Sequence, residues 1–92
     1  MATSEADVQT AVRGGCALFK RMITNLEARI SSERQRLAGL EARLRKVEGQ
    51  PNPDPAEIEQ IKQSISTLQG QIDEDEAGLA DIRIDFEMFC RG

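Results

Sequence analysis

Apolar residues recur at alternating intervals of three and four along two long stretches of the chain. The first series runs Val12, Cys16, Phe19, Ile23, Leu26, Ile30, Glu33, Leu37, Leu40, Leu44 and Val47. The second runs Ile58, Ile61, Ile65, Leu68, Ile72, Asp75, Leu79, Ile82, Phe86 and Phe89. Spacing of this kind places one apolar stripe on each of two α-helices and is typical of a coiled coil. We therefore expect an all-α protein whose stripes pack against each other, each interrupted by one acidic residue.

A short Pro-rich segment, residues 49–55, separates the two stretches. Three prolines within five positions cannot continue a helix, because each lacks an N–H and clashes with the preceding turn. Gly49 suits a left-handed helix C-terminus, and Asp54 suits an N-cap with Glu57 completing a capping box. A short connection puts successive helices side by side and antiparallel. The prediction is a two-helix hairpin with helices over 16–48 and 56–92, in which Cys16 lies opposite Phe89 at the open end.

The first fifteen residues have no counterpart at the other end of the chain. Gly14 and Gly15 follow one another there, and each glycine costs about 1 kcal/mol inside a helix. Residues 1–15 are therefore expected to form an N-terminal arm. The arm either extends the first helix past its partner or folds back over the open end.

The amino-acid composition argues against several classes of function. The chain has 92 residues and no His, Trp or Tyr, so the commonest general base and metal ligand and the usual stacking residues are absent. We expect no enzyme activity, no cofactor, no metal site and no small-molecule substrate. The net charge of −4 makes nucleic acid an unfavourable partner. Neither a membrane span nor a signal peptide is evident, which favours the cytoplasm, or an extracytoplasmic location if a disulfide forms.

The two cysteines lie 74 residues apart in sequence but next to each other in the hairpin. Since Cys16 faces Phe89, the next residue, Cys90, is expected to lie close to Cys16. A Cys16–Cys90 disulfide would join the open ends of the two helices. The alternative is that both residues are small buried hydrophobic side chains.

Two acidic residues occupy core positions, and three arginines form a row along one flank. Glu33 and Asp75 fall near each other across the pair, and we expect a polar core layer that fixes the register. The alternative is a proton-sensitive or metal-binding pair. Arg29, Arg36 and Arg43 recur every seven residues opposite uncharged positions. This basic edge is either a solvated flank or a docking edge for an acidic partner.

Several apolar residues lie off the stripe near the open end, where the rest of the hairpin is polar. They are Leu18, Met22, Ile84 and Met88, with Val8 and Val12 of the arm expected to take part. Exposed apolar patches usually contact something. Either the arm covers them or a second molecule does. A second copy of the chain is favoured, because the symmetric homodimer is the commonest oligomer.

These features favour a non-enzymatic protein–protein interaction or scaffold module that associates with itself. A thin two-helix core usually needs a covalent staple or a partner, and two hairpins could pair into a four-helix bundle. The alternative function is a regulatory binder, an antitoxin-like or chaperone-like clasp for a single partner protein. An enzyme would need a carboxylate metal site, for which only Glu33 and Asp75 are available.

Overall fold

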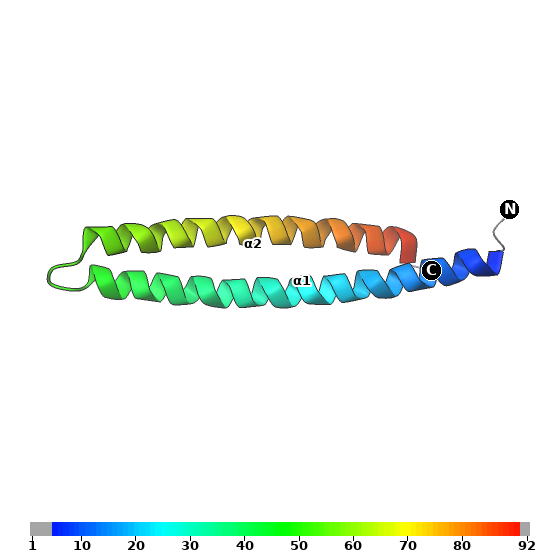
Figure 1. Cartoon of the computed structure of the whole chain (residues 1–92), viewed down its shortest axis with the longest axis horizontal. Coiled ribbons are helices and arrows are strands. Elements are labelled where there is room, and N and C mark those ends of the chain that lie inside the picture. The colour runs from blue at the N-terminus through cyan, green and yellow to red at the C-terminus, as the bar shows by residue number, and fades with distance from the viewer. Residues whose placement is uncertain (1–4, 91–92) are drawn as a thin grey trace.

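The computed structural model describes the backbone of residues 5–90 and the side chains of residues 14–90. Two helices, α1 (Glu5–Glu48) and α2 (Pro55–Cys90), run antiparallel along their shared length and are joined by one short turn (Figure 1). The predicted all-α hairpin is thereby confirmed. The molecule is a rod of 74 × 19 × 15 Å. Neither helix contains a stretch long and apolar enough to cross a membrane, as far as the described residues go.

Asp54, at the end of the turn, caps the start of α2. Its Oδ1 accepts a hydrogen bond from the backbone N–H of Ala56 at 3.0 Å, and its carbonyl oxygen accepts one from the N–H of Ile58 at 3.1 Å. This is the N-cap that the sequence predicts, with Pro55 at the first helical position. Glu57 does not complete the capping box, because its carboxylate instead accepts a hydrogen bond from Arg43 of α1.

The end of α1 differs from the prediction in one respect. Gly49 does not adopt the left-handed conformation, since no glycine among the described residues has a positive φ. Its N–H donates to the carbonyl of Arg45 at 3.0 Å, and the N–H of Gln50 donates to the carbonyl of Val47 at 3.2 Å. The last turn of the helix therefore tightens to use its free carbonyl groups, and no left-handed residue is needed.

The core is the single seam between the two helices. Its most buried apolar side chains are only 3–7% exposed and come from both helices: Ile30, Val47, Ile61, Leu68, Ile72 and Leu79. All six belong to the predicted stripes. Most other stripe residues are half-buried, because a two-helix seam is open to water along both flanks.

Two features at the open end depart from a regular heptad. Phe89, expected in the seam opposite Cys16, is 64% exposed, and the next residue, Cys90, turns toward α1 in its place. Ile82 and Phe86 keep their heptad orientation, half-buried while Arg83 is exposed, so the departure is confined to the last turn of α2. The covalent bond to Cys16 holds Cys90 in its inward orientation.

The other departure is the length of α1. The backbone continues as a helix through Gly14 and Gly15 back to Glu5, beyond the last residue of α2 (Figure 1). Of the two alternatives for the arm, the structure shows the extension. We call residues 5–15 the overhang. The side chains of Val8 and Val12, expected to take part in contacts, lie outside the described part of the structure.

Candidate functional site

The open end of the hairpin is closed by a covalent bond. Cys16 of α1 and Cys90 of α2 form a disulfide, with their Cα atoms 5.6 Å apart and 74 positions of sequence between them. The predicted pairing is confirmed, and both cysteines of the chain are used. We call this region the disulfide end. It has no counterpart at the turn, where the chain itself joins the helices.

A group of large apolar side chains is exposed at the disulfide end and nowhere else among the described residues. We call it the apolar patch: Leu18 (51% exposed), Met22 (39%), Ile84 (57%), Met88 (69%) and Phe89 (64%). Leu18 and Met22 are four residues apart and share a face of α1, as Ile84 and Met88 share a face of α2. Four of the five were predicted as an interface. Phe89 was missed, because the heptad assigns it to the seam.

Charged side chains of both signs are exposed at the disulfide end. On α1, Lys20 and Arg21 are exposed and lie between Leu18 and Met22 in sequence, and the Lys20 ammonium lies 5.9 Å from the centre of the Phe86 ring. On α2, Asp81 and Asp85 are exposed, and Arg83 between them pairs with Glu27 of α1. Two basic residues of α1 and two acidic residues of α2 therefore remain at this end without a partner of opposite charge across the seam, among the side chains that the structure describes.

The basic edge is smaller than the sequence indicates. Arg29 Nε lies 3.3 Å from Asp75 Oδ2, and Arg43 Nη2 lies 3.2 Å from Glu57 Oε1. Only Arg36 forms no ion pair within the described residues. Arg29 reaches Asp75 as the sequence allows, because Asp75 is expected beside Glu33. The pairing of Arg43 with Glu57 was missed, because only the directly opposed, uncharged positions of the second helix were considered for the basic edge. Two of the three arginines are thus paired with acids of α2 within the hairpin.

Glu33 and Asp75 lie in the seam as predicted. Glu33 is 7% exposed, and one carboxylate oxygen of each residue is buried without a hydrogen bond. Arg29 approaches Asp75 as an ion pair, in a geometry that does not make a hydrogen bond. Burial raises the pKa of the Glu33 carboxyl above its ordinary 4.5; the neighbouring Asp75 adds to this rise, and the charges of Arg29 and Arg36 oppose it.

The raised pKa of Glu33 predicts how stability varies with pH. A carboxyl whose pKa is higher in the folded chain favours folding below its unfolded value and loses that contribution as pH rises through the folded value. The free energy of unfolding should therefore fall from about pH 4.5 toward neutrality more steeply in the wild type than in Glu33→Gln. Urea denaturation over a pH series measures this, and parallel curves for the two proteins would contradict it.

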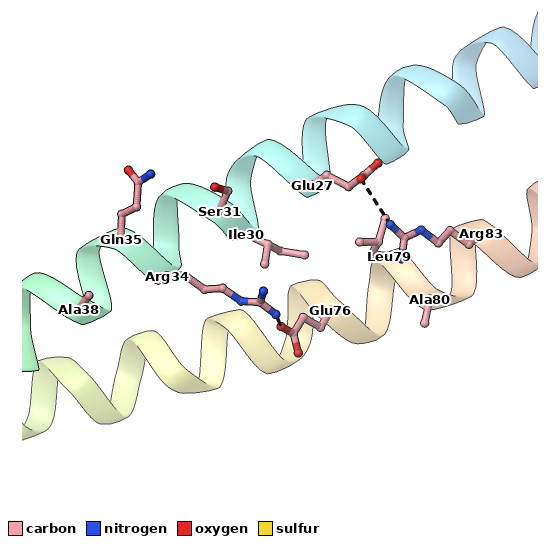
Figure 2. Close-up of a pocket in the computed structure, with 10 residues that line it drawn as sticks. All are labelled: Glu27, Ile30, Ser31, Arg34, Gln35, Ala38, Glu76, Leu79, Ala80 and Arg83. Carbon is pink, nitrogen blue, oxygen red and sulfur yellow. Dashed lines mark hydrogen bonds and ion pairs between the residues drawn. The ribbon is translucent and has the colours of Figure 1, made fainter.

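A shallow groove of about 710 Å³ follows the opposite flank of the hairpin. Figure 2 shows two ion pairs, Arg34–Glu76 and Glu27–Arg83, that cross from helix to helix on either side of its centre. The buried side chains of Ile30 and Leu79 line the groove between them. Each charge here already has an opposite charge within the hairpin, so the groove selects no ligand of either sign. These pairs contribute to register.

Comparison with known proteins adds no assignment, since no family model, curated protein or solved structure matches the chain.

Proposed function

We propose that this protein is a non-enzymatic interaction module that forms a homodimer through the apolar patch. The observation that carries the proposal is the exposure of five large apolar side chains at one end of the hairpin, outside the seam between its helices. Apolar area exposed to water is disfavoured by about 25 cal/mol per Å². A protein partner that covers the apolar patch removes this cost.

Charge complementarity favours a second copy as that partner. In a two-fold arrangement, α1 of one protomer lies against α2 of the other, and the same contact is made twice. Lys20 and Arg21 of each protomer then approach Asp81 and Asp85 of the other. Opposite charges around an apolar centre fix the orientation of such a contact.

The overhang supports the same arrangement. Residues 5–15 extend past the disulfide and have no helix of their own hairpin beside them (Figure 1). A two-fold axis near the disulfide end places the overhang of each protomer along the other hairpin. Over this region four helices lie together, which is the four-helix contact that a thin hairpin core needs.

The test is the double variant Met22→Asp, Met88→Asp. Light scattering should give the wild type twice the chain mass of 10.2 kDa and the variant the mass of one chain, because two buried carboxylates in an apolar contact are unfavourable. Circular dichroism should show the same helix content in both proteins.

The matched control is Ser66→Asp with Gln69→Asp, which adds the same charge at two exposed positions of α2 far from the apolar patch. This control should remain a dimer. A wild-type protein with the mass of one chain at all concentrations would overturn the proposal and favour a clasp for a different partner.

A further inference from the structure

We propose that the disulfide controls the composition of the apolar patch: while it is formed Phe89 is exposed, and its reduction by a dithiol lets Phe89 turn into the seam. The movement concerns a single protomer. Its consequence for binding rests on the function proposed above, because Phe89 belongs to the contact surface only in the oxidised form.

The structure shows a competition between two adjacent residues. Phe89 and Cys90 are neighbours and point about 100° apart around α2, so only one of them can face α1. The heptad places Phe89 inward, but in the structure Phe89 is 64% exposed and Cys90 is bonded to Cys16. The smaller, less apolar side chain therefore holds the inward position, and the covalent bond is what keeps it there.

The two residues of α1 that precede the disulfide carry no side chains that would obstruct a larger residue. Gly14 and Gly15 precede Cys16 on α1, and nothing lies within 4 Å of the position that a Cβ would take at either glycine. Phe86, one turn earlier on α2, is half-buried and continues the apolar stripe. A phenyl ring that turns inward at residue 89 would continue this stripe by one more turn and meet no side chain at the two glycines.

Reduction removes the constraint by ordinary thiol–disulfide exchange. A thiolate of the dithiol attacks one sulfur of the disulfide, the S–S bond breaks, and a mixed disulfide forms. The second thiol of the reductant then displaces the remaining cysteine. Two electrons and two protons pass to Cys16 and Cys90, and the dithiol becomes a cyclic disulfide. The last turn of α2 is then free to rotate toward the heptad position.

The absence of Trp and Tyr allows a direct test. A single Trp introduced as Phe89→Trp reports only its own surroundings. The Met22→Asp change is present in each variant, and the measurements use a concentration at which light scattering gives the mass of one chain. On addition of dithiothreitol the Trp emission should move to shorter wavelength, and quenching by acrylamide should fall by about half or more.

The matched control is Met88→Trp in the same background, at a residue that is 69% exposed on the outer face of α2. Its emission and quenching should not change on reduction. Unchanged emission at residue 89, equal shifts at both positions, or loss of helix content on reduction would each overturn the proposal. Because the measurement is made on a single chain, it remains decisive even if the wild type proves not to dimerise.

Discussion

Replacing Cys16 and Cys90 together by serine is expected to lower the free energy of unfolding by about 4 kcal/mol. The bond joins residues 74 positions apart, so it greatly restricts the unfolded chain. The loss is large relative to the total stability of a small domain, which is about 5–15 kcal/mol. Urea denaturation of the oxidised wild type and of the variant, with linear extrapolation to water, measures the difference.

Two further proteins show whether the bond itself is responsible. Ala17→Ser places a hydroxyl at an exposed neighbouring position and should leave the free energy of unfolding unchanged. The reduced wild type should resemble the serine variant. If the serine variant and the oxidised wild type unfold at the same urea concentration, the two helices are held together at this end by packing alone.

The double variant Glu33→Leu, Asp75→Leu is expected to raise the melting temperature by several degrees. Each residue has a buried carboxylate oxygen without a hydrogen bond, and apolar residues of similar size often match or exceed the stability of buried charges. Arg29 would lose its ion pair, but its side chain is exposed and can be hydrated. Differential scanning calorimetry measures the change.

The same variant should also loosen the choice of oligomer. Without the acids, the apolar stripe of α1 continues unbroken from Ile30 to Leu37, and packing against helices of further chains becomes less unfavourable. Light scattering should then show a broader distribution of masses than for the wild type. A lower melting temperature would contradict this account and show that the carboxylates belong to a satisfied network.

The sequence was sufficient to predict the hairpin because its signals agree with one another. The same reversal of direction is predicted by the two matched apolar stripes, by the prolines of the turn and by the N-cap at Asp54. In agreement with this, α1 ends at Glu48 and α2 begins at Pro55. The disulfide followed from the register alone, since pairing the stripes from the turn brings Cys16 beside Cys90.

The remaining features depend on three-dimensional details that a heptad pattern omits. The sequence left open whether residues 1–15 extend the first helix, and α1 starts at Glu5 because two glycines weaken a helix but do not end one that is already formed. The exposure of Phe89 accompanies the bond at the next residue, Cys90, which a heptad pattern does not take into account. The ion pair of Arg43 with Glu57 arises because a long side chain reaches an acid that is not directly opposite.

The rod shape has a hydrodynamic consequence for this protein. Its radius of gyration is 21.0 Å, whereas a compact chain of this length would have about 12 Å. A rod tumbles and diffuses like a considerably heavier sphere, so a single hairpin elutes from a sizing column earlier than globular standards of equal mass. Two hairpins joined at their disulfide ends would be longer still. Elution volume alone would therefore overstate the number of chains in both cases, and the angular dependence of small-angle X-ray scattering separates a single rod from a pair.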